Sequence, residues 1–392
     1  MKKIAIVTWI RGCNYGTILQ AYALSDYLNK NGQNAVLLDD TNLNKCFDDG
    51  QKAENIASDP PPKSDGKIVY YYKKIKKAAA VLLKPEKRRE YLSSRAFERA
   101  SQGKLSAFNG FKDKYLRRTT PLDKDDLEKT GKDYDAYICG SDQIWTYRSD
   151  LASEYFYLGF TADDKQRIAY APCIGDKGLP DSSVPILKEY LSRFFAISMR
   201  DEYGAELIKG LVNRDISIVC DPVLLKTREE WVNDFSLTNS KQKYLLCYIL
   251  GKHKWYEEKI KKISRKLGLR IRWIPVNPEQ ASFLKKKDFS CGPREFLDLV
   301  YNASFVCTDS FHGTLFSLIF EKQFVNLERY SDTENSQNQR FYSIYRRFCL
   351  PNRLIGETDP VNELTEIRYD KVREKIDEFR EASRDFLLKT LG

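Results

Sequence analysis

The sequence has little of what metal sites and disulfide frameworks require. Among its 392 residues are only two histidines, and none of its nine cysteines belongs to a CxxC pair. An odd number of scattered cysteines favours reduced thiols, and therefore a cytoplasmic protein, over a set of disulfides. With so few clustered ligands, we expect no metal site.

Long apolar runs are also absent. The run Ile4–Ile10 is too short for a signal peptide or a membrane helix, Arg11 ends it, and no small-residue cleavage site follows. We therefore interpret this run as a buried first strand.

The net charge of +10 indicates anionic partners, but no nucleic-acid-binding motif accompanies it. We therefore expect no nucleic acid partner. Basic residues concentrate in the segment 73–89, around a short apolar patch. This segment could contact anionic lipid headgroups at the inner face of the cell membrane, and it could equally be a solvated helix in a variable insertion.

Strands and helices alternate along most of the chain, which is typical of a doubly wound α/β fold. A chain of this length predicts two domains, and the turn-forming residues 175–180 indicate the hinge between them. We expect a first Rossmann-like domain over 1–178 with a helical insertion at 67–118, a second over 179–355, and a last helix within 356–392.

One of the two histidines lies in a turn that suits a charged ligand. The sequence Thr308-Asp309-Ser310-Phe311-His312-Gly313-Thr314 separates an apolar strand at 303–307 from an apolar helix at 315–320. In open α/β sheets, ligands bind where strands end, and helix N-termini offer free N–H groups to anions. The turn therefore predicts an anion-binding site.

Three other predicted strand ends carry similar turns: Gly12-Cys13-Asn14-Tyr15-Gly16-Thr17, Gly140-Ser141-Asp142-Gln143-Ile144-Trp145 and Ile197-Ser198-Met199-Arg200-Asp201. In this order, and with residues 308–314, they resemble the polysaccharide pyruvyl transferase family over roughly residues 1–42 and 130–355. Cys220-Asp221-Pro222 and Gln339-Arg340-Phe341 are weaker matches.

The resemblance implies two Rossmann-like domains that face a cleft, the arrangement called GT-B, and by analogy a last helix that packs back on the first domain. It also implies a reaction. Phosphoenolpyruvate, as co-substrate, gives its three-carbon unit to two hydroxyls of a sugar as a cyclic ketal, and phosphate is released without a cofactor. The family suggests hydroxyls 4 and 6 of a galactose-type residue, in a lipid-linked precursor of a surface polysaccharide such as a capsule.

The donor in such a reaction carries a carboxylate and a phosphate, which guanidinium groups and N–H donors bind well. Arg200 at a strand end is the first candidate, although it could instead pair with Asp201 or Asp221. Arg340, which we expect in a polar loop beside the cleft, is the second. The remaining donor-binding candidates are Ser310, Gly313, Thr314 and, more weakly, Lys322.

Proton transfer requires a group that can both give and accept a proton. His312 is the first candidate, because imidazole titrates near neutral pH. Asp142 could act as a base or bind an acceptor hydroxyl, or it could simply cap a helix. Asp309 could be a second proton carrier, although a capping role fits it as well.

We expect the acceptor sugar on the side of the first domain, 1–178, and phosphoenolpyruvate on the side of the second, 179–355. The candidate ligands of the sugar are Asn14, Tyr15, Gln143 and Trp145; Trp145 could stack on a sugar ring or belong to the core. The segment 170–175 departs from the small, serine-containing segment common in the family, so the acceptor is less well defined than the donor.

Two other functions fit the same pattern. A GT-B glycosyltransferase would use a nucleotide sugar, although the sequence shows no clear element for recognising a base. A catalytically inactive, glycan-binding relative is the third possibility, and the intact Ser310-Phe311-His312-Gly313 sequence argues against it.

Overall fold

A computed structural model describes residues 1–43, 47, 101–175, 178–276, 291–330, 338–361 and 364–392. Most of the helical insertion expected at 67–118, and all of the basic segment 73–89, lie outside these residues. The described part of the insertion, residues 101–115, is helical. Among the described helices, none is both long and apolar enough to cross a membrane.

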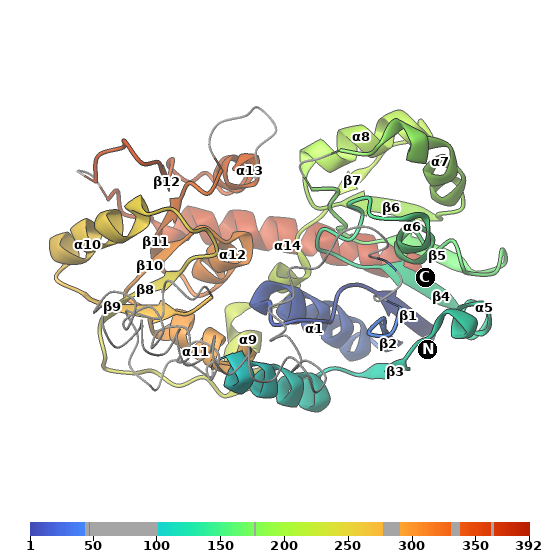
Figure 1. The fold of residues 1–392 in the computed structure, drawn as a ribbon, viewed down its shortest axis with the longest axis horizontal. Coiled ribbons are helices and arrows are strands. Elements are labelled where there is room, and N and C mark those ends of the chain that lie inside the picture. The colour runs from blue at the N-terminus through green and yellow to red at the C-terminus, as the bar shows by residue number, and fades with distance from the viewer. Residues whose placement is uncertain (44–46, 48–100, 176–177, 277–290, 331–337, 362–363) are drawn as a thin grey trace, which may run out of the picture.

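The chain forms two parallel sheets that lie side by side, each flanked by helices (Figure 1). The N-terminal sheet has the order β3-β2-β1-β4-β5-β6-β7. Its strands are β1 (Lys3–Val7), β2 (Asn34–Asp39), β3 (Arg118–Pro121), β4 (Ala136–Cys139), β5 (Gln166–Ala169), β6 (Ala196–Met199) and β7 (Ser217–Ile218).

The C-terminal sheet has the order β12-β11-β10-β8-β9. Its strands are β8 (Tyr244–Tyr248), β9 (Arg270–Ile274), β10 (Phe305–Thr308), β11 (Gln323–Leu327) and β12 (Leu354–Ile355). Two parallel sheets with flanking helices, joined at a shared pocket, agree with the predicted two-domain α/β fold of the GT-B type.

Helices connect and cover the strands. They are α1 (Tyr15–Lys30), α5 (Leu127–Thr130), α6 (Asp150–Phe156), α7 (Val184–Ser192), α8 (Glu202–Val212), α9 (Arg228–Phe235), α10 (Trp255–Leu267), α11 (Pro293–Asn302), α12 (Phe311–Ile319), α13 (Gln339–Arg347) and α14 (Tyr369–Leu391). Short 3₁₀ turns occupy η2 (Lys124–Asp126), η3 (Asp181–Ser183) and η4 (Pro222–Leu225).

The domain boundary expected at 178 does not hold. Ile168 of β5 pairs with Ala196 of β6, and Ser198 of β6 pairs with Ser217 of β7. The N-terminal sheet therefore continues to residue 218, because α7 and α8 cross over to further parallel strands instead of opening a new sheet. The turn at 175–180 lies within the first half.

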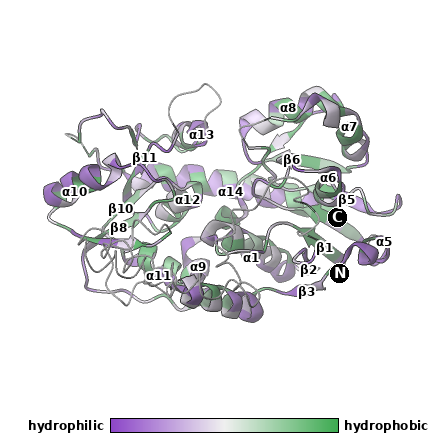
Figure 2. Ribbon diagram, in the orientation of Figure 1, coloured by the Kyte–Doolittle hydropathy of each residue, from purple (hydrophilic) through white to green (hydrophobic). Residues whose placement is uncertain are grey.

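The N-terminal half, built on the seven-stranded sheet, and the C-terminal half, built on the five-stranded sheet, share much of their core. One apolar cluster joins α1 and strands β1, β2 and β4 to η4, α9, α11 and α12 of the second half. A separate cluster fills the other face of the N-terminal sheet beneath α6, α7 and α8. Figure 2 shows hydrophilic residues on α10 and α13 and apolar residues on the strands and α12.

Helix α14 contacts both halves. Its first residue, Tyr369, donates its hydroxyl to the carbonyl of Lys322, and near its end the carbonyl of Thr390 accepts from Gln166 Nε2 at 2.7 Å. Between them, Ser383 Oγ accepts from the backbone N–H of Cys220 at 2.8 Å. The C-terminal turns of α14 thus lie against the first sheet.

Candidate functional site

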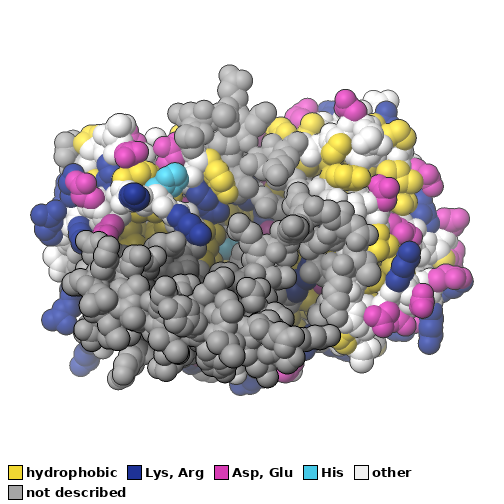
Figure 3. All heavy atoms as spheres, in the orientation of Figure 1, with side chains coloured by type: hydrophobic (Ala, Val, Ile, Leu, Met, Phe, Trp, Pro, Cys, Tyr) yellow, Lys and Arg dark blue, Asp and Glu magenta, His cyan; other side chains and the backbone are white. Residues whose placement is uncertain are grey.

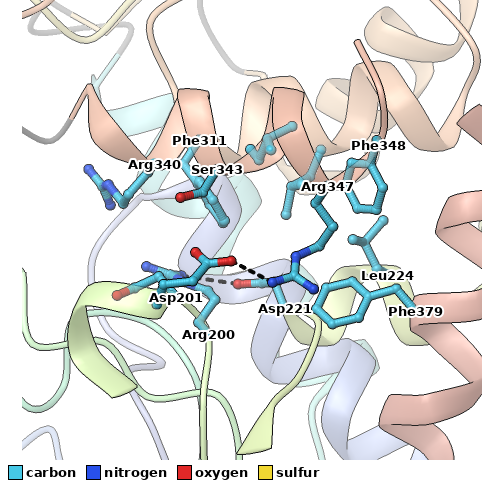
Figure 4. Close-up of a pocket in the computed structure, with 13 residues that line it drawn as sticks. Arg200, Asp201, Asp221, Leu224, Phe311, Arg340, Ser343, Arg347, Phe348 and Phe379 are labelled. Carbon is cyan, nitrogen blue, oxygen red and sulfur yellow. Dashed lines mark hydrogen bonds and ion pairs between the residues drawn. The ribbon is translucent and has the colours of Figure 1, made fainter. Parts of the chain in front are cut away.

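A pocket lies between the two halves (Figure 4). The first half contributes Arg200, Asp201 and Glu202 from the end of β6 and the start of α8, and α13 contributes Arg340 and Arg347. Phe311 of α12 and Phe379 of α14 supply apolar wall. The cations are arginines, and no group of His, Cys, Asp and Glu among the described residues is arranged to hold a metal ion. On the described part of the face in Figure 3, acidic and basic side chains are interspersed.

Several polar groups at this pocket contact Asp221. Its Oδ2 accepts from Ser141 Oγ and Arg200 Nη1, both at 3.1 Å, and lies 3.3 Å from His312 Nε2. Its Oδ1 accepts from the N–H of Val223 at 3.1 Å. Burial acts to raise the pKa of Asp221, but His312, Arg200 and this N–H outweigh burial and hold the pKa well below its ordinary value. Asp221 is therefore a buried carboxylate that orients both His312 and Arg200.

One edge of the Arg200 guanidinium binds Asp221, and the other edge makes no hydrogen bond with the described residues. Only Nη1 binds Asp221, while Nε and Nη2 are buried and donate no hydrogen bond within the described part of the chain. Burial opposes its charge, yet Cys173 and the carboxylates of Asp221, Asp142 and Asp201 raise its pKa above the ordinary value. Nε and Nη2 form the edge of a guanidinium that can bind two oxygens of one carboxylate or phosphate.

Phe311 places a second guanidinium near the first. Arg200 lies 4.4 Å and Arg340 lies 5.8 Å from the centre of the Phe311 ring. Burial lowers the pKa of Arg340, and the neighbouring charge of Arg200 adds to this effect. Arg340 belongs to the first turn of α13, so the prediction that it lies in a flexible loop is wrong. An anion within reach of both guanidinium groups would be stabilised by two positive charges.

His312 lies in the first turn of α12, after the N-cap Ser310, whose Oγ accepts from the N–H of Gly313. Its ring packs against the start of α1. A Cβ atom added to Gly16 would lie 2.1 Å from His312 Nδ1, so only glycine leaves room for the ring. The turn Gly12–Gly16 thus matters because it lets two helix N-termini meet at one imidazole.

Asp142 follows β4 on the same side of the site. Its backbone is left-handed, with φ of 79°, a conformation that costs an aspartate roughly 1–3 kcal/mol. Thr17 Oγ1 of α1 donates to Asp142 Oδ2 at 2.6 Å, and the N–H of Gln143 donates to Oδ1 at 2.9 Å. The strained backbone directs a carboxylate to the start of α1, near His312 and Arg200.

Asp309 has a different place from the one expected of a proton carrier. Its Oδ1 accepts from the N–H of Leu250 at 2.7 Å, and its Oδ2 accepts from the N–H of Gly251 at 2.6 Å and Arg329 Nε at 3.1 Å. Asp309 therefore joins the end of β10 to the loop after β8. Saturation by these donors favours a positioning role.

Of the other donor-binding candidates, Ser310 is buried at the N-cap of α12. Gly313 is required for packing, because a Cβ there would lie 2.5 Å from Thr308 Oγ1. Thr314 is fully buried and accepts from Asn326 Nδ2 at 2.7 Å. Lys322 follows the far end of α12, where burial and then Arg228 lower its pKa to about 8.

The four acceptor candidates divide into two polar residues near Thr17 and two core residues. Asn14 is exposed and caps α1 by accepting from the N–H of Thr17. Gln143 is half-buried beside Asp142. Tyr15 and Trp145 are core residues: the Tyr15 hydroxyl donates to the carbonyl of Cys291 at 2.8 Å, and Trp145 stacks on Tyr157 with ring centres 4.6 Å apart.

Two acidic residues of the site were missed as functional candidates. Asp221 was a weak family match at Cys220-Asp221-Pro222 and a possible ion-pair partner of Arg200, and the structure shows that pair at 3.1 Å. Asp201 caps α8 by accepting from the N–H of Gly204 at 2.8 Å, while its buried Oδ2 accepts no hydrogen bond within the described residues. Its position directly after Arg200 was the available signal.

Comparison with known proteins identifies the family of the chain. The family model described as polysaccharide pyruvyl transferase matches residues 14–331. No curated protein sequence matches the chain.

Similar solved structures are distant. A UDP-GlcNAc 2-epimerase from Methanocaldococcus jannaschii has a TM-score of 0.46 at 12% identity, covering 99% of each chain. The E. coli heptosyltransferase WaaC has a TM-score of 0.38 at 12% identity, covering 96% of this chain and 99% of its own. MurG of Acinetobacter baumannii has a TM-score of 0.37 at 10% identity, covering 98% of this chain and 97% of its own. The family match extends over most of the sequence and includes Asp142, Arg200, Asp221 and His312, and the chain belongs to the polysaccharide pyruvyl transferase family.

Proposed function

We propose that this protein transfers the three-carbon unit of phosphoenolpyruvate to two hydroxyls of a sugar, as a cyclic ketal, and releases phosphate. The observation that carries the proposal is the open, buried edge of Arg200, with Arg340 on the same phenylalanine. Such an edge needs an anion with paired oxygens, and phosphoenolpyruvate carries two such groups.

The donor is proposed to bind with one anionic group on Arg200 and the other towards Arg340 and the start of α12. Ser310 and the first N–H groups of α12 suit a phosphate, because a helix N-terminus carries partial positive charge. The remaining pocket wall is apolar at Phe311 and could face the methylene carbon.

Two C–O bonds form and the C–O bond to phosphate breaks, so two hydroxyl protons must be moved. One proton ends on the methylene carbon, which becomes a methyl group, and the other leaves with phosphate. We assign the first transfer to His312, held 3.3 Å from Asp221, because imidazole can both donate and accept near neutral pH. Asp142 and the open Oδ2 of Asp201 are the candidate groups for receiving the sugar hydroxyls.

The acceptor is proposed to be a galactose-type residue, at hydroxyls 4 and 6, in a lipid-linked precursor of a surface polysaccharide. This acceptor would place the protein at the inner face of the cell membrane. Family membership supports a sugar acceptor, and the choice of sugar and carrier is our expectation from the family.

The test is phosphate release from phosphoenolpyruvate with a panel of lipid-linked galactosyl acceptors, with the mass of the product as second readout. We expect acceptor-dependent release and the mass gain of one pyruvyl ketal. Arg200→Ala and His312→Ala should each lose about 100- to 1,000-fold in rate, the usual effect of removing one charge-stabilising group. Arg200→Lys should not restore the rate, because lysine keeps the charge without the fork.

Arg373→Ala is the matched control, since Arg373 is an exposed arginine of α14 that pairs with Glu321. Release that survives Arg200→Ala and His312→Ala would contradict the assignment of these residues. Binding of a nucleotide sugar with no response to phosphoenolpyruvate would instead favour a glycosyltransferase. Inertness towards both donors, with retained glycan binding, would favour an inactive relative.

A further inference from the structure

A second group of unsatisfied polar atoms lies at the N-terminal sheet, away from Arg200. Both carboxylate oxygens of Asp40, the indole Nε1 of Trp9 and the hydroxyl of Tyr155 are buried, and none makes a hydrogen bond within the described residues. Asp40 and Tyr155 are fully buried. Each buried polar group without a partner costs roughly 1–3 kcal/mol, so several in one place require an explanation.

These groups lie together with two arginines. Arg11 Nε lies 3.4 Å from Asp40 Oδ2, and the guanidinium of Arg148 lies 4.2 Å from the centre of the Trp9 ring. The pKa of Tyr155 is raised well above its ordinary value, mainly by burial and next by the charge of Asp40. We call Trp9, Arg11, Asp40, Arg148 and Tyr155 the edge cluster.

The unmet hydrogen bonds of Asp40 do not follow simply from its burial at the end of β2. The preceding residue, Asp39, is equally buried, yet its Oδ2 accepts from Arg118 Nη1 at 2.7 Å and its Oδ1 accepts from the N–H of Thr41 at 3.0 Å. The fold thus satisfies one of two consecutive aspartates and leaves the other with hydrogen-bonding capacity to spare.

The edge cluster lies on the side of the sheet where ligands bind. Asp40 directly follows β2 and Trp9 follows β1, so both stand at the carboxyl ends of parallel strands, as Asp142 and Arg200 do after β4 and β6. In the order β2-β1-β4-β5-β6, four strand spacings separate Asp40 from Arg200. At about 4.8 Å each, that separation is roughly 19 Å, more than phosphoenolpyruvate or a single sugar ring can bridge.

The chemistry of the edge cluster suits an uncharged polyol. A carboxylate can accept two neighbouring hydroxyls, an indole N–H and a phenol can donate to ring or hydroxyl oxygens, and aromatic rings cover the apolar face of a sugar. Arg11 pairs with Asp40, so the carboxylate needs no cationic ligand.

We infer that the edge cluster binds a sugar residue of the acceptor chain other than the one that is modified. This inference rests on the proposed function. The enzyme would then select acceptors by their length, because a distant sugar binds at β1 and β2 while the reacting sugar lies in the pocket beside Arg200.

The test is calorimetric binding, without donor, of methyl galactoside and of galactose oligosaccharides of two to four residues to the full chain. We expect the tetrasaccharide to bind at least tenfold more tightly than methyl galactoside. Asp40→Asn and Tyr155→Phe should each weaken tetrasaccharide binding by about 5- to 10-fold, the loss of one hydrogen bond, and leave methyl galactoside unchanged.

Tyr157→Phe is the matched control. Tyr157 is a buried tyrosine two residues further on, and its hydroxyl already donates to the carbonyl of Trp145 at 3.3 Å. It should leave binding of both sugars unchanged but lower the melting temperature, whereas Tyr155→Phe should keep or raise the melting temperature because it removes an unsatisfied hydroxyl.

Two results would overturn the inference: sugar binding that is absent or independent of length, or a length effect that survives both Asp40→Asn and Tyr155→Phe. If Tyr155→Phe is destabilised but binds both sugars normally, the edge cluster holds ordered water and no sugar. Thermal stabilisation by phosphoenolpyruvate, lost in Arg200→Ala, tests the proposed function separately. If this stabilisation persists while oligosaccharides fail to bind, only the distant subsite is wrong.

Discussion

Asp40 and Asp309 are comparable, because each directly follows the last residue of a parallel strand that is paired on both sides and each is buried. The carboxylate of Asp309 accepts from two backbone N–H groups and Arg329. That of Asp40 accepts no hydrogen bond within the described residues and has Arg11 at 3.4 Å. The C-terminal sheet therefore uses Asp309 to fix loops, while at Asp40 the N-terminal sheet leaves hydrogen-bonding capacity that the described residues do not use.

The comparison explains why one motif can contain both kinds of residue. Asp309, Ser310 and His312 are neighbours in sequence, yet only His312 reaches across to Asp221 of the first half. Whether a strand-end acid has an unbound oxygen depends on segments far away in sequence.

The largest effect on stability should come from replacing Asp309, the acid whose carboxylate is hydrogen-bonded. Asp309→Asn removes the charge that pairs with the mostly buried Arg329, and we expect the free energy of unfolding in urea to fall by roughly 3 kcal/mol. Asp163→Asn is the control, because Asp163 pairs with Arg193 while 95% exposed, and it should cost less than about 1 kcal/mol. Unchanged stability with lost transferase activity would restore Asp309 as a proton carrier.

Replacing Asp40, whose carboxylate accepts no hydrogen bond from the described residues, should instead raise the free energy of unfolding. Burial, opposed by Arg11, raises the pKa of Asp40 from 3.8 to about 6. Between these values the folded protein keeps a proton that the unfolded chain loses, so this group lowers stability as the pH rises from 4 to 6, with no further change above. Asp40→Asn should remove that loss, becoming more stable than the parent by up to roughly 3 kcal/mol at pH 7 and by almost nothing at pH 4. Urea titrations at the two pH values measure the difference; a constant difference would contradict the raised pKa.

A third change acts where the two halves meet at His312. A methyl group on Gly16 would lie 2.1 Å from His312 Nδ1, so Gly16→Ala must displace the ring. We expect kcat to fall about 100-fold, since a misplacement near 1 Å can cost this much. Gly210→Ala is the control within a helix, because nothing lies within 4 Å of its added Cβ. If Gly16→Ala keeps full activity, His312 does not act from this position.

The smallest effect should come from the ion pair that crosses the pocket. Arg347 of α13 and Glu202 of α8 lie 2.5 Å apart, with side chains 29% and 41% exposed. Such exposed pairs contribute less than about 1 kcal/mol, so Glu202→Gln should barely change the urea midpoint. A large loss would mean that this pair holds the halves together, a role we assign to the shared core.

Much of the fold follows from local pattern. The alternation of apolar strands and amphipathic helices predicted the α/β class, and the turns at Gly12–Gly16 and 308–314 identified two helix N-termini that meet. The boundary at 178 failed because a turn of glycine and proline looks the same within a domain as between domains. Only strand pairing, which joins residues 28 apart at Ile168 and Ala196, distinguishes them.

The site was only partly predictable for a similar reason. Residue type located Arg200 and His312, whose chemistry is specific. It could not separate Tyr15 and Trp145 in the core from aromatic rings that meet a sugar, because both environments favour the same residues. Asp221 needed three partners from distant segments before its role became visible.

Helix α14 has a mechanical consequence for substrate entry. Its 23 residues form a rod of about 34 Å that is fixed to the C-terminal half at Tyr369 and to the N-terminal half at Thr390, and its Phe379 lines the pocket. A hinge that opened the halves widely would have to bend or detach this rod. The protein should therefore admit its substrates through small sliding of α13 and its arginines over a stiff frame, and force applied across the halves would be carried by α14 before it reached the pocket.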